Sequence, residues 1–259
     1  MRIPIYKLDA FANRVFHGNP AAVCPLALWL PDETLQQIAA ENNLPETAFF
    51  VEGKGGYEIR WFTPNQEVDL CGHATLASAH VIFNFVRPGL QAVKFSSKSG
   101  ALKVAKAGEL LALDFPTRIP KPCPPPHGLL EALGAEPQRT LVSRDVMAVY
   151  ESEKDVRKLA PDFDKLAKVN AFAIIVTAPG DEADFVSRFF APRLGIPEDS
   201  ATGSSHCTLI PYWAKRLGKK RLRALQVSPR GGELFCELRG DRVSIAGRTV
   251  LYLEGTIEI

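Results

Sequence analysis

The segment RWFTP (60–64), followed by CGHAT (71–75), decides the fold because the same pattern occurs a second time in the chain. The second copy reads RFFAP (188–192) and is followed by TGSSH (202–206). In each copy an arginine and two aromatic residues precede a proline, and a glycine follows soon after in the sequence. This repeated order predicts an internal duplication.

The spacing of the two copies supports the duplication. Arg60 lies 128 residues before Arg188, and Gly72 lies 131 residues before Gly203. An apolar, strand-like segment precedes each copy, at 47–51 and 171–176 in the chain. The alternative is that an arginine, two aromatic residues and a proline form a common strand ending. In that case the similarity does not indicate a duplication.

The segments that begin at the two glycines contain no Asp, Glu, Lys or Arg. They are GHATLASAHVIFNFV (72–86) and GSSHCTLIPYWA (203–214). An amphipathic surface helix would show a charged face, so each segment predicts a helix that is buried all round. We therefore expect each half of the chain to wrap strands around one central helix, in a fold of the α+β class.

The remaining segments predict short strands and a few outer helices. Residues 32–42 and 181–190 are typical of outer helices or of helix-to-strand transitions, and Asp32 is a candidate N-cap. Turn signals separate the predicted strands, which are 92–95, 110–115, 234–238, 242–245 and 250–253.

A proline-rich segment, PTRIPKPCPPP (116–126), separates the halves. Proline fixes φ and lacks an N–H donor, so this segment predicts an extended linker rather than a helix or a central strand. We predict a first domain at residues 1–116, a linker at 117–127 and a second domain at 128–249.

Composition limits the classes of partner. The chain has 259 residues, of which 46% are hydrophobic and 23% charged, and a net charge of +2. This balance predicts a globular protein without a nucleic-acid or membrane partner. The five cysteines include no CxxC pair, which argues against a disulfide framework and a zinc site, and the sequence predicts a cytoplasmic protein.

The two glycine helix starts are candidate anion-binding positions. The first N–H groups of a helix lack internal partners, and the helix dipole favours negative charge there. We expect Gly72, Gly203 and Ser204 to hold a substrate carboxylate between the two halves, with Thr202 beside them. Capping of their own helix is an equally good explanation for Thr202 and Ser204.

Three residues are candidate proton carriers. His73 falls in the first turn of a predicted buried helix, where burial and the helix dipole favour a neutral ring. Asp199 precedes the second helix start, and Glu46 adjoins an apolar strand, where burial should raise the pKa of its carboxyl group. Each also has a structural explanation, as a buried histidine, an N-cap and a strand-end acid.

Two thiols also fall near the helix starts. Cys71 precedes Gly72, and Cys207 follows Gly203 by four residues, near positions where a thiolate would be stabilised. A racemase with two thiol bases would need a cysteine before each glycine, but Thr202 stands at the second position. A Cys71-dependent epimerase remains an alternative.

Taken in order along the chain, these motifs resemble the PhzF-like isomerases of phenazine biosynthesis. The match extends through almost the whole chain. The segments that carry it, besides RWFTP, are DAF (9–11), GNPAAV (18–23), PETAF (45–49), VDLCGHATLA (68–77), EDSATGS (198–204) and QVSPRGGEL (226–234).

The resemblance implies a diaminopimelate-epimerase-like fold with two similar domains, each a β-barrel-like sheet rolled around a central helix. It also implies a homodimer and a last strand, near residues 250–259, that returns to the first domain. The proton-shuttling glutamate of the family falls on Glu46, and its supporting catalytic residues fall on His73, Asp199 and Ser204. Neither a metal nor an organic cofactor is implied.

The leading hypothesis is a cofactor-independent isomerase that moves a proton between carbons of a small carboxylic acid. Glu46 would carry the proton, while His73 and Asp199 tune or relay it. A binding or regulatory protein that performs no reaction is the alternative from another class. Asn19 and Arg230 are further candidates for substrate contact, although both residue types are equally typical of turns.

Overall fold

The computed structural model describes residues 1–259 and divides into two compact units. Unit 1 comprises Met1–Phe115 together with Ile245–Ile259, and unit 2 comprises Pro116–Ser244. The division falls at the start of the proline-rich segment, where missing N–H donors and fixed φ angles limit strand pairing.

Unit 1 contains ten strands, one α-helix at its edge and one buried α-helix that ends in a π-helical turn. Its elements are β1 (Arg2–Ala10), β2 (Asn19–Leu26), α1 (Asp32–Asn42), β3 (Glu46–Gly53), β4 (Gly56–Phe62), β5 (Glu67–Val68), α2 (Gly72–Val81), η1 (Ile82–Val86), β6 (Ala92–Ser97), β7 (Gly100–Ala107), β8 (Leu110–Pro116), the end of β17 (Arg242–Gly247) and β18 (Thr249–Glu258).

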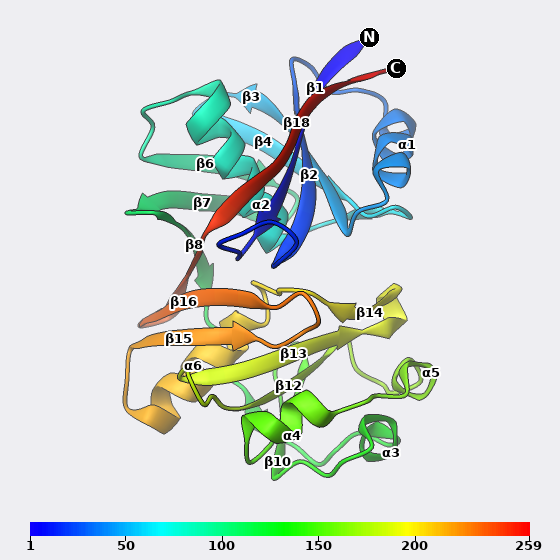
Figure 1. The fold of residues 1–259 in the computed structure, drawn as a ribbon, viewed down its shortest axis with the longest axis vertical. Helices are drawn as coiled ribbons and strands as arrows, with labels where there is room; N and C mark the ends of the chain where they lie inside the picture. Colours follow the sequence, from blue (N-terminus) through cyan, green and yellow to red (C-terminus); the bar gives the residue numbers. More distant parts are fainter. The chain divides into compact units, whose positions relative to one another are not determined.

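The last strand pairs with the first. β18 runs antiparallel to β1 from Ala10↔Thr249 to Arg2↔Glu258, with one register shift between Lys7 and Leu8. Figure 1 shows the two chain ends side by side at the top of this strand pair. The C-terminal segment thus covers an edge of β1 that would otherwise expose unpaired backbone groups.

Two parallel strand pairs explain the placement of the helices in unit 1. β2 and β3 are parallel, as are β4 and β6, whereas the pairs β1–β2, β3–β4 and β6–β7 are antiparallel. A parallel pair needs a crossover connection. Helix α1 lies in the first crossover, and α2 lies in the second.

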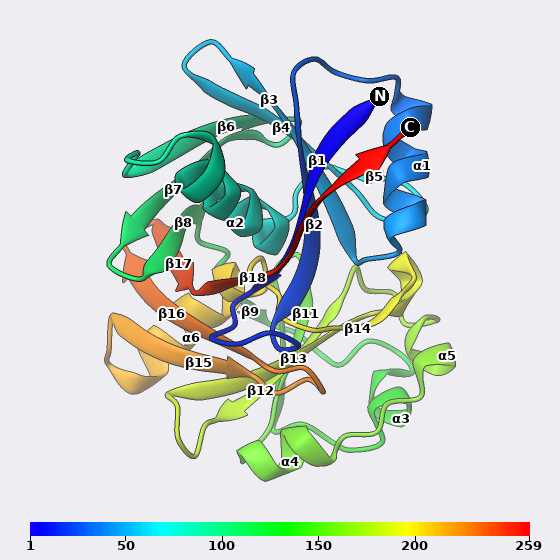
Figure 2. The same ribbon diagram turned by 45° about the horizontal axis from the view of Figure 1, so that its top comes forward.

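Helix α2 is buried, as its lack of charged residues predicts, whereas residues 84–86 at the end of the same charge-free segment are exposed. All of its residues except His80 are buried, and the helix packs on β1, β2, β3 and β7. Figure 2 shows it running among the unit 1 strands. Its hydroxyl groups donate within the helix, from Thr75 to the Cys71 carbonyl and from Ser78 to the Ala74 carbonyl, so burial leaves neither unpaired.

Unit 2 contains the following elements: β9 (Lys121–Pro122), α3 (Leu129–Leu133), β10 (Arg139–Val142), β11 (Val146–Val149), α4 (Glu153–Lys158), α5 (Phe163–Leu166), β12 (Ile174–Pro179), β13 (Phe185–Ala191), η2 (Pro192–Leu194), β14 (Ile196–Asp199), α6 (His206–Leu217), β15 (Arg221–Gln226), β16 (Gly232–Arg239) and most of β17.

The strands of unit 2 pair in the same order as those of unit 1. The pairs β10–β11, β12–β13 and β15–β16 are antiparallel, and the pairs β11–β12 and β13–β15 are parallel. Helices α4 and α5 lie in the first parallel crossover, and α6 lies in the second. The segments that repeat in the sequence therefore occupy matching strands, β4 and β13.

The two repeated arginines also make matching ion pairs. Nε and Nη2 of Arg60 donate to the two carboxylate oxygens of Glu67 at 2.7 and 2.9 Å. Nε and Nη2 of Arg188 donate to Glu198 at the same two distances. In each unit the bidentate pair joins the long repeated strand to the short strand after it.

Three local predictions from the sequence are wrong. Residues 181–190 contain no helix, so of the predicted outer helix or helix-to-strand transition only the strand is present: the apolar run Phe185–Ala191 forms β13 and is buried along its whole length between β12 and β15. Pro31, not Asp32, is the N-cap of α1. Helix α6 begins at His206 rather than at Gly203, after a turn that is held by side chains.

None of the helices is both long enough and apolar enough to cross a membrane.

Candidate active site

Strand register brings Asn19 and Glu46 to one place in unit 1. Ala21 of β2 pairs with Glu46 of β3. Side chains alternate between the faces of a strand, so Asn19 lies on the same face as Ala21 and Glu46. Asn19 is fully buried and Glu46 retains 8% exposure, so an amide and a carboxyl group share an apolar environment.

His73 lies between these two side chains. It is the second residue of α2, and its imidazole is buried. Nε2 of His73 is 3.0 Å from Oε2 of Glu46, and Nδ1 is 3.1 Å from Nδ2 of Asn19. Each ring nitrogen therefore has a polar partner, which fixes the plane of the ring.

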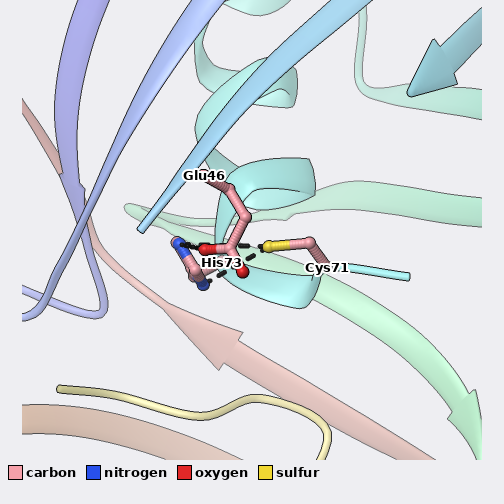
Figure 3. Close-up of side chains that lie close together, drawn as sticks. All are labelled: Glu46, Cys71 and His73. Atoms are coloured by element: carbon pink, nitrogen blue, oxygen red, sulfur yellow. Dashed lines mark hydrogen bonds and ion pairs between the residues drawn. The ribbon is translucent and has the colours of Figure 1, made fainter. Parts of the chain in front are cut away.

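Cys71 completes the cluster. Its Sγ lies 3.5 Å from Nδ1 and 3.9 Å from Nε2 of His73. Figure 3 shows the three side chains converging, with the Glu46 carboxyl group drawn between the imidazole and the Cys71 sulfur. Cys71 occupies the N-cap position of α2 in an extended conformation, which turns its side chain back over the start of the helix.

The amide of Asn19 can serve either protonation state of the imidazole. With Nδ2 directed at the ring, Nδ1 accepts a hydrogen bond and the ring proton resides on Nε2, facing Glu46. A half-turn of the amide would present Oδ1, which accepts a proton from an imidazolium. The Asn19 amide thus contacts the imidazole of His73 in either state.

The prediction of a neutral His73 ring is wrong, because residues in contact with the ring favour its charged form. Burial lowers the pKa of the imidazole, but its contacts with Cys71 and Glu46 raise it well above 6.5. Near pH 7, where Cys71 is a neutral thiol, the charge that favours the imidazolium is the Glu46 carboxylate. The sequence predicts a neutral ring because the helix start and its burial can be inferred from the residue pattern. The contact with the Glu46 carboxylate forms only when the chain folds.

The thiolates expected at the helix starts are not favoured. Burial, with a further contribution from Glu46, raises the pKa of Cys71 to about 11. Burial likewise raises the pKa of Cys207 to about 11. Both groups are therefore neutral thiols at pH 7, since desolvation outweighs the helix dipole.

The unit 1 cluster has the donor set of a metal site. One ligand atom each from Glu46, Cys71 and His73 lies within 4.8 Å of the others, and all three residues are buried. Carboxylate oxygen, thiolate sulfur and imidazole nitrogen are the protein ligands of Zn²⁺, so this cluster offers a donor set without the CxxC pair on which the sequence argument against a zinc site depends.

In unit 2, Gln226 organises the turn between β14 and α6. Its Oε1 accepts from the backbone N–H of Thr202 at 2.7 Å, and its Nε2 donates to the Asp199 carbonyl at 2.8 Å. The hydroxyl of Thr202 donates to the Asp199 carboxylate. Asp199, Thr202 and Gln226 therefore form one hydrogen-bonded group, and the Thr202 N–H is already used.

Gly203 and Ser204 lie in the turn that follows this group. Oγ of Ser204 accepts a long hydrogen bond, 3.4 Å, from Nη2 of Arg144. Arg144 also holds the buried carboxylate of Asp145. The Ser204 hydroxyl therefore lies beside a positive charge that the sequence patterns do not reveal.

The predicted residues form two groups. Asn19, Glu46, Gly72 and His73 come together in unit 1, and Asp199, Thr202, Gly203 and Ser204 lie along one turn of unit 2. Two further participants, Gln226 and Arg144, are missed by the sequence reading. Gln226 begins the QVSPRGGEL segment that carries part of the resemblance, so a signal for it is present, whereas none marks Arg144.

Comparison with known proteins identifies the family. The family model described as "Phenazine biosynthesis-like protein" matches residues 8–255. A Pseudomonas aeruginosa protein named an uncharacterized isomerase is 50% identical over 259 residues, with full coverage of both chains. The crystal structure of a PhzF-family phenazine biosynthesis protein from Enterococcus faecalis has 48% identity and a TM-score of 0.98, again with full coverage of both chains.

A more distant likeness concerns the fold alone. A hydroxyproline epimerase from Agrobacterium vitis has a TM-score of 0.64 at 10% identity, over 99% of this chain and 92% of that one. The mixed α+β fold is therefore shared with epimerases. From the family match and the full-length likeness, the chain belongs to the phenazine biosynthesis-like protein family and is an enzyme of the isomerase type.

Proposed function

We propose that the chain is a cofactor-independent isomerase that moves a proton between two carbons of a small carboxylic acid, with Glu46 as the single acid/base. The observation that supports this most directly is the 3.0 Å contact between the buried Glu46 carboxyl group and Nε2 of His73. A carboxyl group held in an apolar site against a titratable ring suits repeated gain and loss of a proton.

In this proposal the proton balance closes within the enzyme and its substrate. The C–H bond next to an activating group breaks, its proton passes to the Glu46 carboxylate, and its electron pair stays on the substrate. Glu46 then returns the proton to a different carbon. The positive imidazole of His73 stabilises the carboxylate form between cycles, and Asn19 holds the ring in place.

The carboxylate of the substrate needs hydrogen-bond donors, which the Glu46 carboxylate cannot supply. The backbone N–H of Gly72 is the proposed donor in unit 1, and the N–H of Gly203 and the Ser204 hydroxyl are the proposed donors in unit 2. Thr202 supports the Asp199 carboxylate rather than binding substrate through its N–H, because Gln226 already accepts from that group. Preorganised donors of this kind stabilise negative charge that develops on the substrate.

The two units are also proposed to be copies of one ancestral domain, each a sheet rolled around its central helix. The matching order of strand pairs and the matching Arg60–Glu67 and Arg188–Glu198 pairs support this proposal.

A panel of small carboxylic acids, incubated with the protein in D₂O and followed by NMR, tests the function. A substrate should acquire deuterium at carbon and convert to an isomer. Binding by the panel members without any C–H exchange would favour a catalytically idle binding protein and contradict the proposal.

A Cys71-dependent epimerase is the second candidate, because Sγ of Cys71 lies 3.5 Å from Nδ1 of His73. The raised pKa of the thiol, about 11, weighs against it. Cys71→Ser should retain exchange if Glu46 is the acid/base, whereas loss of all exchange in a folded variant would favour the thiol.

A further inference from the structure

Donor geometry in unit 1 suggests a second kind of occupant for the Glu46 cluster. Tetrahedral Zn²⁺ with ligand bonds of about 2.0–2.3 Å separates nitrogen from oxygen by about 3.4 Å and sulfur from nitrogen by about 3.6 Å. The corresponding separations from Nε2 of His73 are 3.0 Å to Oε2 of Glu46 and 3.9 Å to Sγ of Cys71. The carboxylate oxygen needs an adjustment of a few tenths of an ångström, whereas the Cys71 side chain must rotate to bring Sγ, which lies 3.5 Å from Nδ1, in front of Nε2.

Charge supports the same conclusion. A thiolate from Cys71, a carboxylate from Glu46 and a neutral imidazole from His73 together neutralise one divalent cation. Neutrality matters because all three residues are buried, where an uncompensated charge is costly. The bound cation would displace the thiol proton, as metals do at cysteine ligands.

Asn19 supplies the supporting contact that histidine ligands need. A histidine that binds a metal through Nε2 donates its other ring N–H to a neighbouring acceptor, which fixes the ring. The side chain of Asn19 lies 3.1 Å from Nδ1 and is fully buried, and a half-turn of its amide presents Oδ1 to that N–H.

We propose that Glu46, Cys71 and His73 form a Zn²⁺-binding site that reversibly inhibits the isomerase. Three protein ligands leave the fourth tetrahedral position open to water or to a carboxylate. Hard cations such as Mg²⁺ do not favour thiolate and imidazole, so the site discriminates against them. A bound cation would inhibit because it occupies the Glu46 oxygen that carries the proton. The inhibition therefore rests on the proposed function, whereas the binding does not.

Titration of the full-length chain with Co²⁺, followed by competition with Zn²⁺, tests the site without any substrate. One equivalent of Co²⁺ should give a near-ultraviolet thiolate charge-transfer band, and Zn²⁺ should abolish it. Cys71→Ser should lose the band, and Glu46→Gln should bind more than about 100-fold more weakly, because loss of a ligand exceeds the effect of a supporting residue. Asn19→Ala should weaken binding by about 10–100-fold.

Cys123→Ser is the matched control, because Cys123 is a partly exposed thiol outside the cluster. It should leave the band and the affinity unchanged. Absence of a band in the folded parent, or equal affinity in the parent and the Glu46→Gln variant, would overturn the proposal.

Inhibition is measured separately by solvent exchange. Zn²⁺ should stop exchange, a chelator should restore it, and Mg²⁺ should have no effect. If the chain exchanges no substrate at all, the proposed function fails while the Co²⁺ result stands. If exchange is normal and Zn²⁺ binds without slowing it, the inhibitory role is wrong.

Discussion

Two buried histidines, one in each unit, have pKa values shifted in opposite directions. His73 faces Glu46 and Cys71, and its pKa lies well above 6.5. His206 donates from Nδ1 to the Thr202 carbonyl at 2.8 Å, and burial lowers its pKa to about 4. A nearby carboxylate thus decides whether a buried imidazole is charged.

The lowered pKa of His206 makes the stability of the fold depend on pH. Below pH 6.5 the unfolded chain binds a proton at this position that the folded chain does not bind until about pH 4. As the pH is lowered from 6.5 to about 4, the free energy of unfolding should therefore decrease by about 3 kcal/mol because of this residue. Urea unfolding at pH 7 and at pH 4.5 measures the change.

His206→Gln removes the titrating group and should flatten this part of the pH dependence, even though it also lowers stability at pH 7. An unchanged difference between the two pH values in the variant would show that other groups are responsible.

At the residue scale, the sequence predicts which residues come together better than it predicts their charge states. The resemblance places Glu46 and His73 in the site, and the structure brings their side chains to 3.0 Å. The charge of His73 depends on the Glu46 carboxylate, which only the fold brings to the ring, and the neutrality of Cys71 depends mainly on burial, so no local pattern contains either. Gln226 lies in a segment that carries part of the resemblance, but its role is missed because only the fold brings it to its partners in the turn after β14.

At the scale of elements, the two arginine pairs should differ in their effect on stability. Arg188 and Glu198 have side-chain exposures of 10% and 13%, and Arg188 also donates to the carbonyls of Val156 and Leu159. Arg188→Gln should cost about 3–5 kcal/mol, because a buried carboxylate loses its partner. Chemical denaturation measures this.

Arg60→Gln is the comparison variant. Arg60 and Glu67 are slightly more exposed, at 19% and 17%, and Lys98 also contacts Glu67. The smaller burial and the second cation should limit its cost to less than that of Arg188→Gln. Equal or reversed costs would mean that burial does not decide the strength of these pairs.

Elements with a distinctive pattern are predicted well from sequence, and elements with a mixed pattern are not. The charge-free segment 72–86 and the outer helix 32–42 both form helices. Residues 181–190 begin with acidic residues typical of a helix start, but their apolar half pairs with two strands of unit 2. Tertiary pairing overrides local preference there.

At the scale of the whole molecule, the proline-rich segment marks the division of the chain, since 116–126 begins where unit 2 begins. The pairing of β18 with β1 has no signature in composition or periodicity, because it joins residues about 250 positions apart. Only the resemblance leads to it. The homodimer that the same resemblance implies stays a prediction.

The account depends on Glu46 as the residue that moves the proton, and solvent-deuterium exchange by Glu46→Gln tests this most directly. Glu33→Gln is the matched control, because Glu33 is exposed in the first turn of α1. Once a substrate is known, Glu46→Gln should lose at least about 10²-fold in exchange rate, while Glu33→Gln keeps the parental rate. A folded Glu46→Gln protein that exchanges at the parental rate would contradict the account.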